Sequence, residues 1–96
     1  MFTIDLSLKN SQLYAGCKIT EVGGRLTLAT DSQEASNIVG RNVAQMLEEN
    51  EDHTEVTITG PMAVWSYLVV FHWVVHRFGK VWYDDGRSGP ILIAQH

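Results

Sequence analysis

Apolar and polar residues alternate along several short segments of the chain, which is typical of half-buried β-strands. Residues 2–8 have apolar side chains at every even position, and a turn at residues 9–11 follows them. Residues 13–19 and 25–30 have weaker strand character. The sequence Glu-Val-Gly-Gly at residues 21–24 between them is typical of a hairpin turn. We therefore predict three strands in the first third of the chain.

Two longer segments have helical character. Residues 32–49 carry apolar side chains on one side only, and Asp31 followed by Glu34 has the form of a capping box. The second helix is predicted to start at Gly60 and Pro61, with proline at its first position, and to stop at Gly79.

The second predicted helix is apolar on nearly every side. Because one face of a sheet can cover only one side of a helix, we expect the other side to be buried by a partner chain. The apolar run of residues 62–75 is too short to cross a membrane.

Three more strands are predicted at residues 55–59, 80–83 and 91–94, the last of them antiparallel. The element order β-β-β-α-β-α-β-β indicates an α/β fold, a Rossmann-like or ferredoxin-like sandwich of about five to six strands with two helices. Residues 1–96 are expected to form one domain.

Charge and composition narrow the classes of partner. The net charge is −4, which disfavours binding to duplex DNA or to bulk RNA. Residues 54–96, however, hold three acidic residues, three basic residues and three histidines, so a small anionic ligand is compatible with this half. The single cysteine and the absence of a basic, apolar leader lead us to expect a cytoplasmic protein.

Two histidines four residues apart, His72 and His76, could share a metal ion if both lie on one helix face. A third ligand is not evident beside them, and a buried, hydrogen-bonded side chain is the favoured interpretation of His72. His76 is the better candidate for acid–base chemistry, because imidazole changes charge near neutral pH.

The remaining candidates each have a plain structural alternative. The junction at Gly60 and Pro61 could cradle an anion, or simply begin a helix. Asp84, Asp85 and Arg87 share a segment that could be no more than a turn. For His96, at the end of the sequence, disorder is the default expectation.

Strand directions divide these candidates between two poles. The second helix runs antiparallel to the strand after it, so His76 lies near the start of that strand and Asp84 near its finish. The last strand turns back and brings His96 to the pole of His76, leaving Arg87 with Asp84. We predict that an active site using all four residues must be assembled between molecules.

Residues 59–96 resemble the small stand-alone CRISPR-associated ring nucleases of type III systems, distant relatives of the CARF superfamily. That family's pattern is a Ser-Gly-Arg-Gly-Pro-like turn, a helix with histidine, a strand finishing in Tyr-Asp-Pro-Arg and a last strand finishing in Ser-His. The counterparts here are Thr59-Gly60-Pro61, His72 with His76, Tyr83-Asp84 with Arg87, and Gln95-His96.

The chain departs from that pattern in several places. The arginine of the glycine turn is absent, Asp85-Gly86 replaces the proline before Arg87, and the first half contains an additional hairpin and a longer first helix.

The resemblance implies a manganese-dependent phosphodiesterase that cleaves cyclic tetra-adenylate and so switches off the antiviral response. It also implies homodimers that stack into tetramers with shared active sites. On this hypothesis the ligand lies against the turn at Asn10 and Ser11 and the turn at Gly60. A second set of residues transfers protons, neutralises charge and binds the metal. The expected ligand-binding residues are Asn10, Ser11, Thr59, Gly60 and Pro61, and the expected catalytic residues are His76, Asp84, Arg87 and His96, with Asp84 also binding the metal.

Two other hypotheses stay open from the sequence. One is a module that binds cyclic oligoadenylate without cutting it, which the departures from the family pattern favour. The other is a structural homo-oligomer without a ligand, built around the apolar helix.

Overall fold

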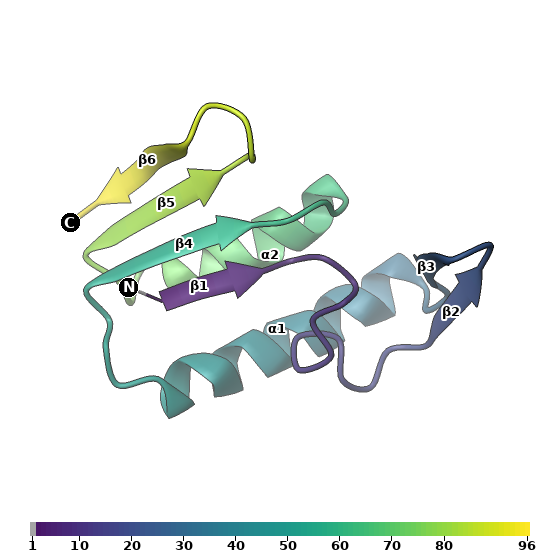
Figure 1. The fold of residues 1–96 in the computed structure, drawn as a ribbon. Coiled ribbons are helices and arrows are strands. Elements are labelled where there is room, and N and C mark those ends of the chain that lie inside the picture. The colour runs from purple at the N-terminus through teal and green to yellow at the C-terminus, as the bar shows by residue number, and fades with distance from the viewer. Residues whose placement is uncertain (1) are drawn as a thin grey trace.

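Four strands form one mixed sheet, and two more form a separate hairpin (Figure 1). The computed structural model describes residues 2–96. It confirms an α/β fold with six strands and two helices in the predicted order. The elements are β1 (Phe2–Asp5), β2 (Ile19–Val22), β3 (Arg25–Leu28), α1 (Ser32–Glu49), β4 (Glu55–Thr59), α2 (Val64–Val74), β5 (Lys80–Asp84) and β6 (Pro90–Gln95).

The main sheet has the order β1-β4-β5-β6, in which the first three strands are parallel and β6 is antiparallel to β5. Helices α1 and α2 lie on the same face of this sheet and pack against each other (Figure 1). The carboxyl ends of β1, β4 and β5 therefore meet along one border of the sheet, which we call the carboxyl edge.

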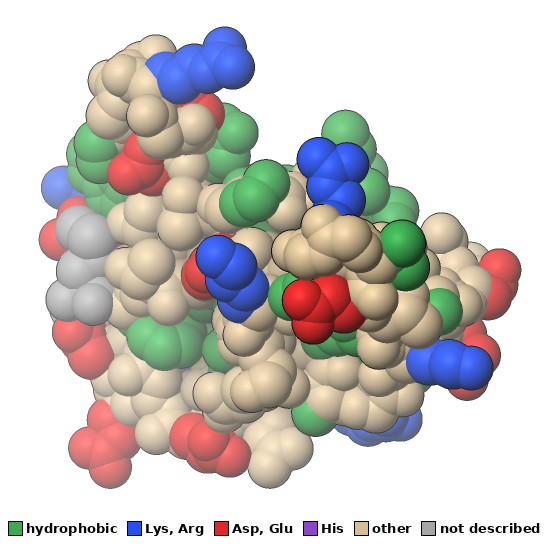
Figure 2. Space-filling model, turned by 45° about the vertical axis from the view of Figure 1, so that its right-hand side comes forward, with side chains coloured by type: hydrophobic (Ala, Val, Ile, Leu, Met, Phe, Trp, Pro, Cys, Tyr) green, Lys and Arg blue, Asp and Glu red, His purple; other side chains and the backbone are tan. Residues whose placement is uncertain are grey.

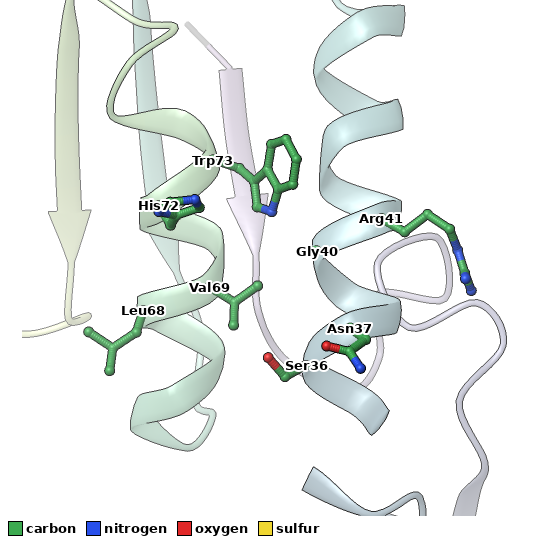
Figure 3. A pocket seen from close by; sticks show the side chains of 8 residues that line it. All are labelled: Ser36, Asn37, Gly40, Arg41, Leu68, Val69, His72 and Trp73. Atoms are coloured by element: carbon green, nitrogen blue, oxygen red, sulfur yellow. The ribbon is translucent and has the colours of Figure 1, made fainter. Parts of the chain in front are cut away.

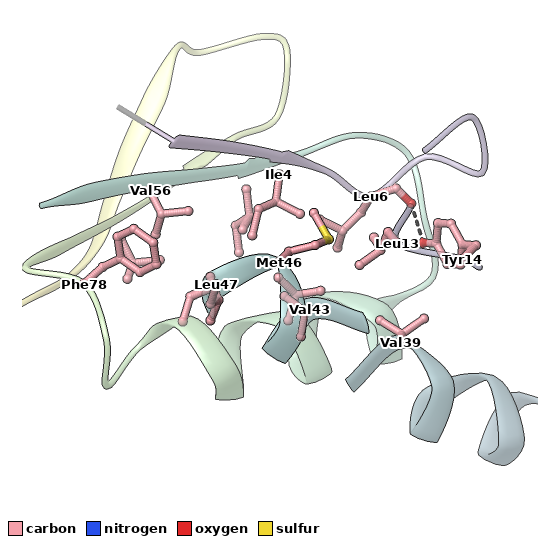
Figure 4. Close-up of a cluster of buried hydrophobic side chains, with 14 residues drawn as sticks. Ile4, Leu6, Leu13, Tyr14, Val39, Val43, Met46, Leu47, Val56 and Phe78 are labelled. Carbon is pink, nitrogen blue, oxygen red and sulfur yellow. Dashed lines mark hydrogen bonds between the residues drawn. The ribbon is translucent and has the colours of Figure 1, made fainter. Parts of the chain in front are cut away.

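The core lies between the sheet and the two helices (Figure 4). Alternate residues of the strands point into it and meet one apolar side of each helix, as the sequence pattern predicts. Its fully buried members include Ile4, Val56 and Val81 from the sheet and Val43 and Val70 from the helices. This single layer of core fixes the carboxyl edge relative to both helices.

Helix α1 and strand β4 have the predicted bounds. The amide of Glu34 donates to Asp31 Oδ2 at 3.4 Å, so the predicted N-cap of α1 is confirmed. Strand β1 is shorter than predicted, because the amide of Ser7 turns back to Asp5 Oδ1 at 2.9 Å.

The strand predicted at residues 13–19 is wrong. Residues 11–17 form turns, and Leu13 and Tyr14 are buried core residues, which explains their apolar pattern. The Asn42 side chain donates to the carbonyls of Leu13 and Ala15, at 2.8 and 2.9 Å, so these backbone groups need no neighbouring strand. The Tyr14 hydroxyl donates to the Leu6 carbonyl (Figure 4).

Helix α2 is also shorter than predicted at both ends. It begins at Val64, because Gly60 has a φ of 105°, in the left-handed region that an α-helix cannot include. Ala63 precedes the first helical residue, and the Ser66 amide donates to the Ala63 carbonyl. The helix ends at Val74, so His76 lies in the turn that follows it.

Two sides of α2 are covered, rather than the one side that we expected. The second cover is α1, where Gly40 allows the indole of Trp73 to approach: a Cβ at Gly40 would lie 3.1 Å from Trp73 Nε1. Val64 and Leu68 stay 74% and 64% exposed, so the predicted partner chain would cover a narrower stripe than the sequence indicates. In the described part of the chain, neither helix is long and apolar enough to cross a membrane.

Candidate functional site

Three residues form a row across the carboxyl edge. Asp5 pairs in register with Thr59, and Thr59 pairs with Asp84 on the other side. The Thr59 hydroxyl donates to the Asp84 carbonyl at 2.7 Å and so links the ends of β4 and β5. Because ligands of open α/β sheets bind outside the carboxyl ends of the strands, a ligand-binding site is expected at this edge.

Directly after this row the chain makes a tight turn at Gly60. A Cβ there would lie 2.3 Å from Asp5 Oδ1 and 2.9 Å from the Ser7 nitrogen, so only glycine fits. The Asp5 carboxylate is itself occupied, since its two oxygens accept from the Ser7 amide at 2.9 Å and the Ser7 hydroxyl at 3.1 Å. The Gly60 turn is thus held against the end of β1 by contacts that the sequence pattern does not reveal.

A pocket of about 310 Å³ opens beside this turn, and we call it the tyrosine pocket. The rings of Tyr67 and Tyr83 lie edge to face within it, with centroids 5.3 Å apart. The Tyr67 hydroxyl donates to the Gly60 carbonyl, and burial raises the pKa of Tyr67 to about 12, so this phenol stays neutral at physiological pH. The pocket is lined by Thr59, Gly60, Pro61, Tyr67, Tyr83, Asp84, Asp85 and Gly86.

The β5–β6 loop contributes the acidic side of the pocket. Asp84 is half-buried, and its Oδ1 accepts from the Gly86 amide at 2.8 Å. Asp85 Oδ1 accepts from the amides of Ser88 and Arg87, at 3.0 and 2.8 Å, and these hydrogen bonds lower the pKa of the Asp85 carboxyl. Asp84, the last residue of β5, and Arg87, in the loop that follows, therefore lie at the same end of the strand, with the Arg87 side chain exposed.

The predicted histidines lie at the opposite end of β5. The His96 amide donates to the Gly79 carbonyl at 2.8 Å, and His96 Nε2 lies 2.7 Å from the Val75 carbonyl. The structure thus places His96 in contact with the chain, where disorder was the default expectation. His76 follows Val75 directly, so both histidines occupy one pole, as the strand directions predict.

The two poles do not meet within one chain. In the β5–β6 pair, Lys80 is opposite Gln95 at the histidine pole and Asp84 is opposite Pro90 at the other. Four strand intervals of about 3.3 Å each put these ends roughly 13 Å apart. One chain therefore does not bring His76 and His96 to Asp84 and Arg87.

His72 belongs to neither pole, and its predicted burial is wrong. Its ring is exposed and lies edge-on to Trp73, with centroids 6.0 Å apart. It lines an open groove of about 590 Å³ between α1 and α2, together with Arg41 and Leu68 (Figure 3). His76 lies two residues beyond the end of α2, in the turn that follows the helix.

The described residues include no group of three or more His, Cys, Asp or Glu side chains arranged to hold a metal ion. Asp84 supplies one carboxylate, with one oxygen already accepting an amide, and both oxygens of Asp5 accept from Ser7. Because Mn²⁺ favours a shell of several oxygen ligands, Asp84 would need further ligands to hold this ion.

The other predicted ligand residues lie in the loop after β1. Asn10 is used structurally, because its amide nitrogen donates to the Asp5 carbonyl at 2.7 Å and its oxygen accepts from the Leu13 amide at 3.2 Å. Ser11 is exposed. The sequence interpretation overlooked Tyr67 and Asp5; the predicted strand over residues 2–8 put Asp5 near its middle, whereas β1 ends at Asp5.

Fold and site together define a two-layer α/β domain with a small pocket at the carboxyl edge of its parallel strands. Comparison of the chain with family models, with curated proteins and with solved structures found no match in any of the three.

Proposed function

We propose that this protein is a ring nuclease that binds cyclic tetra-adenylate at the carboxyl edge and cleaves it with residues from two copies of the chain. Its place would be the cytoplasm, where it would end type III CRISPR antiviral signalling. The observation that supports this most is the tyrosine pocket, which joins a side-chain-free glycine turn, two aromatic rings and the Asp84 carboxylate.

Each part of the pocket suits a piece of a nucleotide. Adenine bases stack on aromatic rings, and Tyr67 and Tyr83 supply such rings at the pocket wall. Gly60 and Pro61 line the same pocket, and the proposal places a phosphate of the ring against this turn. Asn10 and Ser11 lie in the loop after β1, and contact of this loop with the ring stays part of the proposal.

Cleavage requires a nucleophile, two proton transfers and charge neutralisation. In the proposed step a ribose 2′-hydroxyl attacks the adjacent phosphorus, and the bond from phosphorus to the 5′-oxygen breaks, leaving a 2′,3′-cyclic phosphate. His76 or His96 from another copy takes the 2′ proton, and the other gives a proton to the departing 5′-oxygen. Arg87 neutralises charge on the phosphate, and Asp84 orients the attacking group.

These steps are written with protein side chains alone, and Asp84 is the residue that would hold a Mn²⁺ ion. Manganese dependence stays a prediction of the family resemblance alone. It is tested by comparing the cleavage rate in EDTA with the rate in added Mn²⁺, and dependence on the ion would point to a shell completed by phosphates and a second chain.

The direct test is incubation of labelled cyclic tetra-adenylate with Asp84→Asn, which keeps an acceptor for the Gly86 amide while removing the charge. We expect cleavage to fall by at least about 100-fold, in line with the usual size of such catalytic contributions. Glu48→Gln, which removes an exposed acid from α1, serves as control and should cleave normally. Full activity of Asp84→Asn would contradict the proposal.

One observation favours a second function, a module that binds the cyclic nucleotide without cutting it. The four residues expected to be catalytic lie at two separated poles of the chain. If copies do not assemble pole to pole, the tyrosine pocket alone would hold the ring. In the same assay, a binder would retard the intact ring on a native gel and yield no linear or dinucleotide product.

A further inference from the structure

We propose that the groove beneath the β2–β3 hairpin is a second phosphate-binding subsite, with Lys9 and Arg25 as its cations. This hairpin groove has a volume of about 510 Å³. Pro61 lines both the hairpin groove and the tyrosine pocket, so the two hollows adjoin at the Gly60 turn. The inference rests on the proposed function, because it extends the same ligand site.

The charge of the groove lining carries the inference. Among the described residues that line it, Lys9 and Arg25 are the only charged ones, although the whole protein has a net charge of −4. Within residues 2–96, neither of these side chains has a hydrogen bond or an ion pair. Two unneutralised cations beside a pocket are available to bind phosphate oxygens, for which arginine and lysine are the usual partners.

Figure 2 views the hairpin end of the molecule more directly than Figure 1. Its basic side chains stand apart from one another, with acidic side chains beside some of them, and do not merge into one broad patch. This distribution suits a short ligand with a few defined phosphates better than a long polyanion, which would need a continuous basic track.

Apart from Ser7 and Gly24, the rest of the lining is apolar and can accept a base or a ribose. Leu8, Leu26 and Met62 line it, and Leu26 is 37% exposed. The groove therefore combines two cations with an apolar wall.

The hairpin itself contributes little to the core. Strands β2 and β3 pair only with each other, and all of their residues except Ile19 and Leu28 are exposed. The hairpin holds Arg25 beside Pro61, next to a glycine turn that has no arginine of its own. Substituting Arg25 should therefore alter ligand binding without unfolding the domain.

The test compares the unmodified protein with Lys9→Gln and Arg25→Gln, using Lys18→Gln as control. Lys18 is exposed and lies just before β2, outside the groove lining. Two probes are titrated separately: labelled cyclic tetra-adenylate and inorganic tripolyphosphate, which has no base. We expect each groove variant to bind each probe about tenfold more weakly, the size of one charge-assisted hydrogen bond, and Lys18→Gln to bind normally.

The outcomes separate this inference from the proposed function. Binding of tripolyphosphate but not of the cyclic nucleotide, with loss in Arg25→Gln, would support the subsite and overturn the ring nuclease. Unchanged binding of cyclic tetra-adenylate by both variants, with circular dichroism showing them folded, would overturn the subsite and leave the nuclease standing. Failure of the unmodified protein to bind either probe would overturn both.

Discussion

Gly60 shows how a single residue fixes the geometry of the carboxyl edge. Its left-handed φ and its contact with Asp5 both forbid a side chain. We predict that Gly60→Ala lowers the free energy of unfolding by about 3 kcal/mol, since strain and overlap each cost about 1 to 3 kcal/mol. Gly86→Ala is the matched control: its φ is also positive, but no atom lies within 4 Å of the added Cβ, so strain alone should cost about 1 kcal/mol. Equal losses in urea denaturation of the two variants would show that the contact with Asp5 is unimportant.

Tyr67 is expected to make the stability of the folded protein depend on pH. Its pKa of about 12 in the folded protein lies above the ordinary tyrosine value, because burial disfavours the phenolate. The folded state thus keeps a proton that the unfolded chain loses, so this contribution to stability is complete below about pH 10 and is lost as the pH rises toward 12. We expect the melting temperature to fall over this range, and to fall less in Tyr67→Phe. An identical pH dependence in the variant would refute this role of burial.

Several individual residues could be placed from the sequence, and others could not. Strand directions alone put His96 with His76, and Arg87 with Asp84, because a strand fixes which of its ends is which. The contacts of Gly60 could not be foreseen, since they join residues more than fifty positions apart. Pro61 resembled a helix start, whereas the positive φ before it delays the helix to Val64.

At the scale of elements, the helix and strand with the clearest periodicity were predicted best. Helix α1 has both a cap and a one-sided apolar face, and strand β4 alternates cleanly, so local pattern and tertiary environment agree. Residues 13–19 have strand-like composition, yet Leu13 and Tyr14 serve as core residues in a turn. Local composition cannot distinguish these two uses of buried side chains.

The exposed apolar stripe of helix α2 leads to a prediction about oligomerisation. If Val64 and Leu68 form a contact with a second copy, Leu68→Glu should place a charge in that contact and dissociate the oligomer. Sedimentation velocity should then show the mass falling toward the 10.8 kDa of one chain. Val22→Glu, which alters a similarly exposed residue of the hairpin, should leave the mass unchanged. If Leu68→Glu sediments like the unmodified protein, the stripe on α2 is not an interface.

At the scale of the whole molecule, the sheet topology keeps the two groups of residues expected to be catalytic at opposite ends of β5. Because β5 and β6 are antiparallel, the loop that joins them carries Asp84 and Arg87, and the far end carries His96. Neither pole can move to the other without breaking the sheet. Cleavage through all four residues is therefore possible only where the carboxyl edge of one copy faces the histidine pole of another.

Mixing two inactive variants tests this shared site most directly. Asp84→Asn and His96→Ala should each fail to cleave cyclic tetra-adenylate alone, because each lacks one pole. In an equal mixture, random assembly gives about one site in four an intact carboxyl edge and an intact histidine pole, so we predict recovery of about a quarter of the original rate. Full cleavage by either variant alone, or no recovery from a mixture whose oligomers are shown to exchange subunits, would contradict a site built from two chains.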